Sequence, residues 1–157
     1  MFWARGNGWL IYFLVDHQMS RQRRGLGPDP AVAEVLRRHA LALVACQHTD
    51  GLWRTDLLGP ASRDNPAEVS ASALILVALG RARRAKLLPE VQRTLLLKGR
   101  LALRAAIRWD RGHPTLTGVS TGTMPGFRRY YRAVPMDKNV AHGVGAVLLA
   151  LSQPEPR

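Results

Sequence analysis

Every residue from Val69 to Leu79 is apolar or small, and this run constrains the fold more than any other part of the sequence. A helix without a polar face is stable in water only where other elements cover it on most sides. We therefore predict a buried helix over residues 67–84. A second helix of the same kind is predicted over Ala141–Ser152, which is apolar except at its start.

Three further helices are predicted from start signals and helical spacing. Asn7 can cap a helix over residues 8–20, Asp29 followed by proline begins one over residues 30–47, and a proline in the first turn begins one over residues 89–107. The last two carry arginines on one face. This contrast with the two apolar helices predicts an inner layer of helices wrapped by an outer one.

The segment from Trp109 to Pro135 differs from the rest of the chain. It contains four glycines and three prolines with β-branched residues between them, which favours short strands or an ordered loop. The sequence therefore predicts one all-α domain over residues 1–157, with about five helices and a Gly/Pro-rich loop before the last helix.

Composition limits the class of protein. The 157 residues include one cysteine, Cys46, so no internal disulfide can form and a reducing, cytoplasmic location is expected. No apolar run reaches the ~20 residues that span a bilayer, and the short run Trp9–Val15 is interpreted as a buried helix rather than a targeting segment. No membrane partner is expected.

The charge is strongly positive, with 23 Lys and Arg against 11 Asp and Glu, a net charge of +12. Such a balance suits nucleic acid, so a basic helical nucleic-acid-binding module is kept as an alternative function. However, the arginines are scattered and few aromatic residues are available for stacking on bases, which argues against nucleic acid as a partner.

The densest candidate site is the string from Trp3 to Trp9, which holds two tryptophans, Arg5, Asn7 and two glycines. Tryptophan faces pack on the apolar faces of sugar rings, and arginine can form two parallel hydrogen bonds with a carboxylate. The alternative is that both tryptophans are core residues beside a helix cap. The five histidines show no metal-ligand spacing, and no phosphate-binding loop is present, so the sequence predicts neither a metal nor a cofactor.

The same string, Trp-Ala-Arg-Gly-Asn-Gly-Trp, resembles a signature of the unsaturated glucuronyl and rhamnogalacturonyl hydrolases, glycoside hydrolase families 88 and 105. Other segments are similar to motifs of that group in the same order along the chain. They are Asp50-Gly51-Leu52-Trp53, Glu68 to Ala73, Gly118 to Thr123 followed by Tyr130-Tyr131, and His142 to Ala146.

The resemblance implies an (α/α)6 toroid of which this chain supplies the C-terminal portion. It also implies a glycosidase that acts on oligosaccharides ending in a 4,5-unsaturated uronic acid, such as an unsaturated rhamnogalacturonan disaccharide, by hydrating the double bond. By motif position, Arg5 would bind the uronate carboxylate and Trp3 and Trp9 would frame the ring. Asn7 and His142 complete the expected substrate-binding residues.

The resemblance does not supply a catalytic residue. The family's catalytic aspartate lies upstream of the motif that here begins two residues after Met1, so a fragment without it is expected. Asp16 is interpreted as a solvated helix residue, and Asp50, Asp56 and Asp64 as turn residues. Glu68 is expected to stabilise a helix start or to fix the motif loop.

An incomplete toroid would leave apolar helix faces without partners. The segments Leu74–Leu79 and Val147–Leu151 are the faces expected to be exposed, which predicts self-association. A third reading follows from the same argument: a non-catalytic carbohydrate-binding or assembly subunit that completes its ring with another chain.

Overall fold

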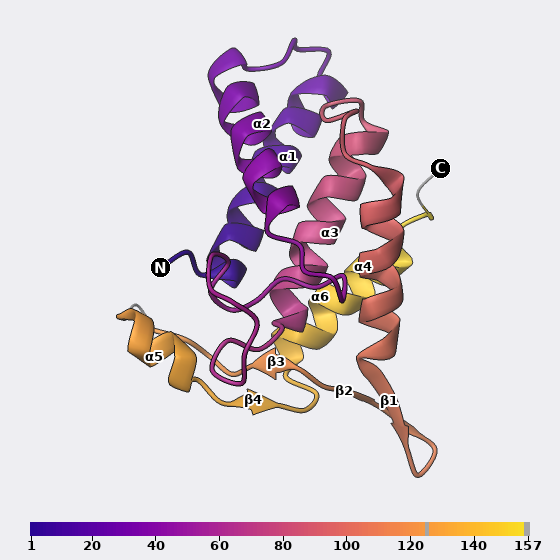
Figure 1. Cartoon of the computed structure of the whole chain (residues 1–157). Helices are drawn as coiled ribbons and strands as arrows, with labels where there is room; N and C mark the ends of the chain where they lie inside the picture. The colour runs from indigo at the N-terminus through magenta and orange to yellow at the C-terminus, as the bar shows by residue number, and fades with distance from the viewer. Residues whose placement is uncertain (125, 156–157) are drawn as a thin grey trace.

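The computed structural model describes residues 1–124 and 126–155, which contain six helices and four short strands (Figure 1). The helices are α1 (Ala4–Arg23), α2 (Pro30–Ala45), α3 (Val69–Arg84), α4 (Arg93–Ala105), α5 (Arg128–Ala133) and α6 (Ala141–Ser152). The strands are β1 (Ile107–Asp110), β2 (His113–Leu116), β3 (Val119–Ser120) and β4 (Met136–Asp137). β1 pairs antiparallel with β2, and β3 with β4.

Helix α3 lies at the centre of the fold. All of its residues from Val69 to Gly80 are buried, and it packs against α1, α4 and α6. Figure 1 shows α2 lying over α1 and α4 lying alongside α3. The predicted inner position of α3 is thus confirmed, whereas α6, which was also predicted to be an inner helix, leaves Leu148 and Leu149 exposed. The chain is predominantly helical, as expected of part of a toroid.

Two helices begin elsewhere than predicted. The chain enters α1 through a single antiparallel bridge between Trp3 and Asp56, so the helix begins at Ala4 and Asn7 lies inside its first turn. Helix α4 begins at Arg93 instead of near residue 89, because the preceding residues form a turn whose carbonyls accept hydrogen bonds from Arg83. The starts of α2, with Asp29 as its cap, and of α6 are confirmed.

The Gly/Pro-rich segment contains more structure than expected. The predicted short strands are present, but β1 already begins at Ile107. Residues 128–133 form helix α5, which the sequence pattern did not predict because none of its residues is buried and no apolar stripe marks it. Pro125 lies outside the described residues.

Burial corrects two expectations about apolar segments. Residues Leu74–Leu79 are buried within the domain and are not exposed. The N-terminal apolar run is buried on one side only, since Ile11 is 0% exposed whereas Phe13 is 72% exposed. The exposed apolar side chains of the two edge helices are Trp9, Leu10 and Phe13 on α1 and Leu148 and Leu149 on α6.

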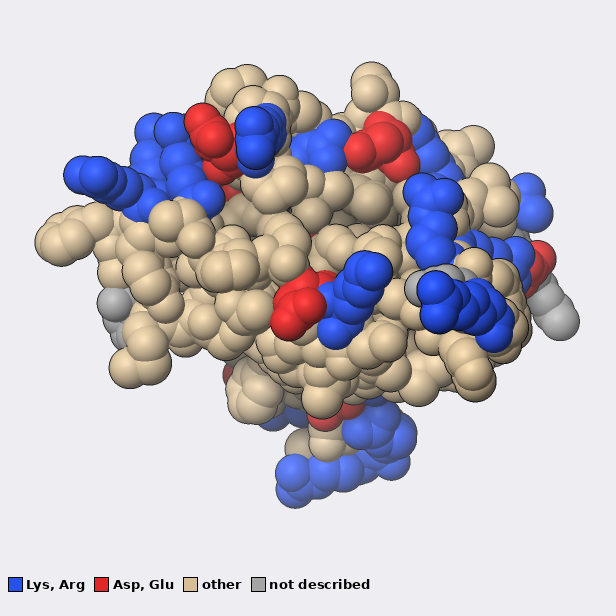
Figure 2. Space-filling view, turned by 90° about the horizontal axis from the view of Figure 1, so that it is seen from below, with Lys and Arg blue, Asp and Glu red and all other residues tan. Residues whose placement is uncertain are grey.

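Charge is distributed around the molecule. On the face shown in Figure 2, Lys and Arg side chains form several separate groups, some with Asp or Glu beside them. That face carries no single continuous basic patch, in keeping with the scattered arginines of the sequence. Within the described part of the chain, none of the helices has the length and apolar character needed to cross a bilayer.

Candidate functional site

The start of the chain is held in place by the segment around Asp56. Ala4 N donates a hydrogen bond to Thr55 O at 2.9 Å, and Leu57 N donates to Phe2 O at 2.9 Å. Chain termini are ordered where such backbone pairing ties them down. These bonds set the direction in which α1 begins and therefore the position of Arg5 in its first turn.

The guanidinium of Arg5 is buried, with the residue only 5% exposed. One terminal nitrogen donates to Ser120 O at 2.9 Å and contacts Nε2 of His142. The other donates to Thr121 O at 2.9 Å and to Thr123 Oγ1 at 3.5 Å. Both ends of the guanidinium fork therefore organise the loop after β3 and the start of α6.

Aromatic rings extend the site from Arg5 toward α5. The Arg5 guanidinium carbon lies 5.3 Å from the centroid of the Trp3 ring, which is within the range of a cation–π contact. The Trp3 and Tyr131 rings are 5.2 Å apart, and Tyr130 packs on Tyr131 at 5.4 Å. Gly6 leaves room for this arrangement, since a Cβ there would lie 2.9 Å from the Trp3 ring.

Glu68 fixes the loop that holds Arg5. Its carboxylate is 0% exposed and accepts hydrogen bonds from Ser70 Oγ and from Ala71 N, which caps α3. The carboxylate also accepts from Ser120 N at 3.1 Å. Ser120 therefore links the two residues, because its amide donates to Glu68 and its carbonyl accepts from Arg5. Both expected roles of Glu68, at a helix start and as an anchor beside the motif, match these contacts.

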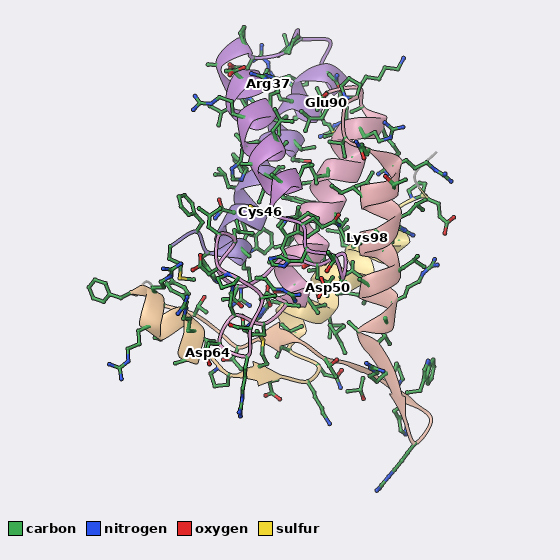
Figure 3. All side chains as sticks on the ribbon, in the orientation of Figure 1. Arg37, Cys46, Asp50, Asp64, Glu90 and Lys98 are labelled. Carbon is green, nitrogen blue, oxygen red and sulfur yellow. The ribbon has the colours of Figure 1, made fainter. Side chains whose placement is uncertain are left out.

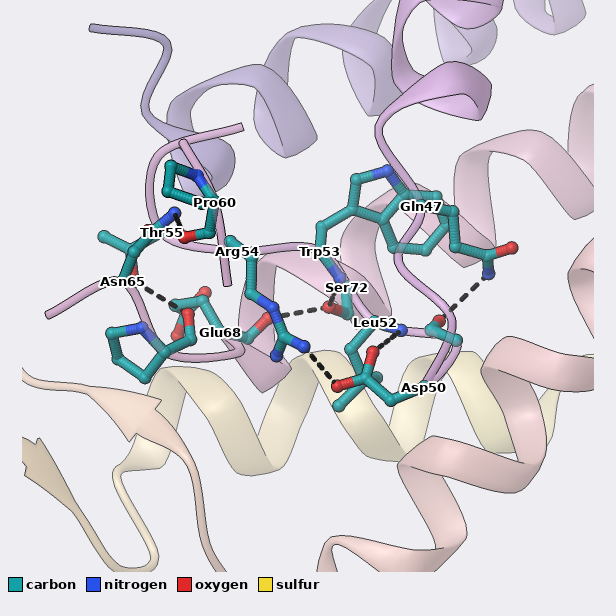
Figure 4. Close-up of polar contacts among 12 residues, drawn as sticks. Gln47, Asp50, Leu52, Trp53, Arg54, Thr55, Pro60, Asn65, Glu68 and Ser72 are labelled. Atoms are coloured by element: carbon teal, nitrogen blue, oxygen red, sulfur yellow. Dashed lines mark hydrogen bonds and ion pairs between the residues drawn. The ribbon is translucent and has the colours of Figure 1, made fainter. Parts of the chain in front are cut away.

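Figure 4 shows the exposed turn at Asp50, which leads through Leu52 into the buried Trp53. Asp50 Oδ1 accepts from Leu52 N at 3.1 Å and Oδ2 pairs with Arg54 at 2.6 Å, which confirms the predicted turn role. Gly51 has φ +85°, a conformation that favours glycine. Trp53 is fully buried and donates its indole N–H to Leu43 O at 2.7 Å.

The side chains of Asp16 and Asp56 each form an ion pair with an arginine other than Arg5. Asp16 forms an ion pair with Arg81 at 2.8 Å and is not simply solvated as expected. Asp56 does begin a turn, since its carbonyl accepts from Gly59 N at 3.1 Å. Its side chain, however, is 1% exposed and pairs through Oδ2 with Arg128 at 2.6 Å, which the prediction did not include. Its main-chain bridge to Trp3 buries it, and no sequence pattern signalled that pairing.

The structure brings together three of the five expected substrate-binding residues, Trp3, Arg5 and His142. Asn7 donates its side-chain amide to Trp3 O at 2.8 Å, and its own carbonyl faces His39 on α2. Trp9 is 54% exposed and contacts Tyr12 on the same helix. The sequence did not predict the carbonyls of Ser120 and Thr121 as partners of Arg5, because a main-chain group is not marked by any residue type.

The family model for Glycosyl Hydrolase Family 88 matches residues 1–156. The chain belongs to this family. A protein of Rhizobium radiobacter, the 24.9 kDa protein in the picA locus, is 34% identical over 96% of this chain and 70% of its own length. The family match includes the motif that carries Arg5.

More distant relatives show the fold and the extent of the match. The unsaturated 3S-rhamnoglycuronyl hydrolase of Alteromonas sp. is 27% identical over 98% of this chain. The crystal structure of a possible glycoside hydrolase family 105 member from Klebsiella pneumoniae superposes with a TM-score of 0.81 at 28% identity. The family 88 chain spans 35% of the Alteromonas protein and 38% of the Klebsiella structure.

In this family 88 chain the contact with Arg5 bears on the protonation of the His142 ring. A guanidinium can only donate, so this contact is a hydrogen bond only when Nε2 of His142 is unprotonated. Residue His142 is exposed as a whole, but partial desolvation of its ring lowers the pKa of His142 from its ordinary value of 6.5, and the charge of Arg5 lowers it further. The Glu68 carboxylate acts in the opposite direction but does not reverse the shift.

We expect this shift to make the protein less stable in acid. The folded pKa is lower than the unfolded value, so below about pH 6.5 the unfolded chain binds more protons at His142. Stability from this group is complete above the unfolded pKa and is lost as the pH falls through the folded pKa. Urea unfolding of wild type and His142→Gln at several pH values measures it, and an equal pH slope in both would contradict the assignment.

Two polar atoms beside Arg5 have no partner among the described residues. They are the indole N–H of Trp3 and the hydroxyl of Ser120, both buried. Buried polar atoms without a partner cost free energy, and a hydroxyl or carboxylate oxygen would satisfy either of them. The site thus combines a buried cation, aromatic faces and unsatisfied donors.

Proposed function

We propose that this chain supplies the substrate-binding part of a glycosidase that acts on oligosaccharides ending in a 4,5-unsaturated uronic acid. Membership of glycosyl hydrolase family 88 and the name of the Alteromonas relative, an unsaturated rhamnoglycuronyl hydrolase, support the reaction class. The observation that carries the proposal is the buried Arg5 beside Trp3 and the loop after β3.

Arg5 is proposed to supply the positive charge that attracts the uronate carboxylate and to hold the loop that the sugar contacts. Trp3 offers an indole donor and a ring face, and His142 lies exposed at the edge of the same cluster. The half-exposed Trp9 offers a second ring face along α1. Asn7 is proposed to act through Trp3, whose carbonyl it binds.

The general acid and base is proposed to come from outside the described residues. Hydration of the double bond requires a general acid that protonates carbon and a general base that activates water, and one carboxyl group can fill both roles in turn. Glu68 is occupied by three donor groups, and the Oδ2 of Asp56 is occupied by Arg128. Glu68 is therefore fully occupied. The Oδ1 of Asp56 has no partner among the described residues, but it is buried and could reach a ligand only after a rearrangement.

We expect the isolated chain to bind an unsaturated uronate disaccharide without turning it over. Loss of acid–base participation costs ~10²–10⁴-fold in rate. The measurement is the loss of the double bond's ultraviolet absorbance, with the Alteromonas relative assayed in parallel, and calorimetry for binding. Turnover at the rate of that relative would show that a carboxylate of this chain acts as the general acid and base. Asp16 would then be the first residue to replace. Absence of binding would overturn the proposed function itself.

The domain assignment is also proposed. Residues 1–157 would form a single unit that corresponds to the C-terminal portion of an (α/α)6 domain, supported by the order of its motifs. The exposed apolar side chains on α1 and α6 are the surfaces through which it would associate with itself or with other helices.

A further inference from the structure

A hollow lies at the end of α3 that is opposite the Arg5 cluster. It has a volume of about 560 Å³ and is formed by the last turn of α3, the turn that follows it, the start of α4 and the chain after α6. Helix α3 has 16 residues, so its two ends are ~24 Å apart and the hollow is separate from the loop that Glu68 anchors. Figure 1 shows the turn between α3 and α4 at the top of the molecule, away from β3.

The wall of the hollow combines cationic and apolar side chains. Arg84 ends α3 and Lys86 follows it, and both line the hollow. The Arg84 side chain folds back along α3, because its Nη1 lies 3.6 Å from the position that a Cβ on Gly80 would take. The apolar part of the wall consists of Leu96, Pro89 and Pro154.

The arginines in the last turn of α3 differ in their partners. Cations are favourable at the C-terminal end of a helix, and two of the three have further contacts that explain them. Arg81 pairs with Asp16 at 2.8 Å, and Arg83 donates to two carbonyls of the following turn. Arg84 instead donates at 2.6 Å to the side-chain oxygen of Gln153, which is a neutral group.

Two acidic residues close to the hollow act on cations outside it. Glu155 lines the hollow but pairs with Arg104 on α4 at 3.5 Å. Glu90 lies in the turn between α3 and α4, and Figure 3 shows it near Arg37 on α2. The hydrogen bond from Arg37 to Glu34 raises the pKa of Arg37 most, and the charge of Glu90 raises it further.

The charges of Arg84 and Lys86 are therefore not balanced by a carboxylate. Neither residue has an ion pair within the part of the chain that the structure describes. Arg84 is exposed as a whole, but partial desolvation of its guanidinium lowers its pKa, and the charges of Arg81 and Arg100 lower it further. Arg100 is 8% exposed beside Arg84 and donates to Ala150 O at 2.7 Å. A bound anion would relieve this excess of positive charge.

We infer that the hollow is a binding site for a small molecule that carries a phosphate group. A phosphate monoester has a charge of about −2 at pH 7, which matches the two cations that lack an acidic partner, Arg84 and Lys86. Arginine offers paired donors to phosphate, and lysine adds a mobile point charge. The organic part of the ligand packs on Leu96 and the two prolines, and the volume lies within the range of small-molecule sites. This site is independent of the proposed function, because it lies at the other end of α3 from Arg5.

The test is titration calorimetry of the whole chain with glucose 6-phosphate, inorganic phosphate and glucose at constant ionic strength. It compares wild type with R84Q/K86Q, which removes both cations from the hollow. The matched control R108Q/R111Q removes the same charge from exposed positions on the β1–β2 hairpin. Because Arg84 and Lys86 are exposed, circular dichroism should show unchanged folding in both double variants.

Wild type and the control are expected to bind inorganic phosphate and to bind glucose 6-phosphate about tenfold more tightly than glucose, equivalent to ~1.4 kcal/mol. R84Q/K86Q is expected to lose this preference. The single variant K86Q, which keeps the bond between Arg84 and Gln153, should weaken binding of glucose 6-phosphate about threefold, so the site is also tested without disturbing Arg84.

Three results would overturn the phosphate site. Wild type does not bind either phosphate compound, R84Q/K86Q retains the preference for glucose 6-phosphate, or R108Q/R111Q loses it equally, which would show a general effect of net charge. Binding of an unsaturated uronate disaccharide should be the same in wild type and R84Q/K86Q. Failure of wild type to bind that disaccharide would contradict the proposed function and leave the phosphate result unaffected.

Discussion

Replacing Arg5 with lysine is expected to weaken binding of an unsaturated uronate disaccharide by ten- to a hundredfold, although the positive charge is kept. Lysine is a point charge that cannot span the carbonyls of Ser120 and Thr121 as the guanidinium fork does. Loss of one charge-assisted hydrogen bond costs ~1.5–3 kcal/mol. Unfolding in urea should show a loss of similar size, because a buried carbonyl is left without a donor.

The control for this prediction is Arg81→Lys. Arg81 pairs with Asp16 and lies over Tyr12, away from the Arg5 cluster, so its replacement should leave affinity unchanged. A neutral disaccharide with the carboxylate reduced should bind wild type poorly. If wild type and Arg5→Lys bind charged and neutral sugars with equal affinity, the motif around Arg5 is only structural.

Replacing Glu68 with alanine is expected to lower the free energy of unfolding by about 3 kcal/mol and to abolish binding of the uronate. Loss of a helix cap costs ~0.5–2 kcal/mol, and the buried amide of Ser120, left without an acceptor, adds ~1–3 kcal/mol. The loop that holds Arg5 would lose its anchor at the same time. Urea denaturation and calorimetry measure the two effects.

Asp29→Ala is the matched control for the Glu68 variant. Asp29 caps α2 by accepting hydrogen bonds from Ala31 N and Val32 N, and none of its described contacts reaches the loop after β3. Its loss should cost ~1 kcal/mol, as for an ordinary cap, with affinity unchanged. Equal costs for the two variants would contradict the role of Glu68 as an anchor.

Apolar pattern and cap chemistry were sufficient to predict most of the fold. The uninterrupted apolar run of α3 required burial on all sides, and Asp29 followed by proline marked the start of α2. The predicted starts of α1 and α4 were wrong. The start of α1 depends on the Trp3–Asp56 bridge between segments distant in sequence, and the start of α4 depends on a local turn whose carbonyls accept from Arg83. Helix α5 has no apolar stripe to signal it.

The motifs predicted several residues of the candidate site, but they did not predict how those residues contact one another. Trp3, Arg5 and His142 were identified from the motifs, and the structure brings them together. The sequence could not show that the Arg5 guanidinium donates to main-chain carbonyls, because every residue has a carbonyl group. The pairing of Asp56 with Arg128 likewise joins two residues 72 positions apart with no shared motif.

The contacts of Arg5 also determine when the site can form during folding. Its partners Ser120 and His142 lie 115 and 137 positions further along the chain. Contacts of such high sequence separation carry a large loop-closure entropy and form slowly compared with local helical turns. Helices α1 to α4 can therefore pack together before the site exists. The guanidinium becomes buried only when the last helix docks, so a site-specific probe at Trp3 should report the slowest phase of refolding.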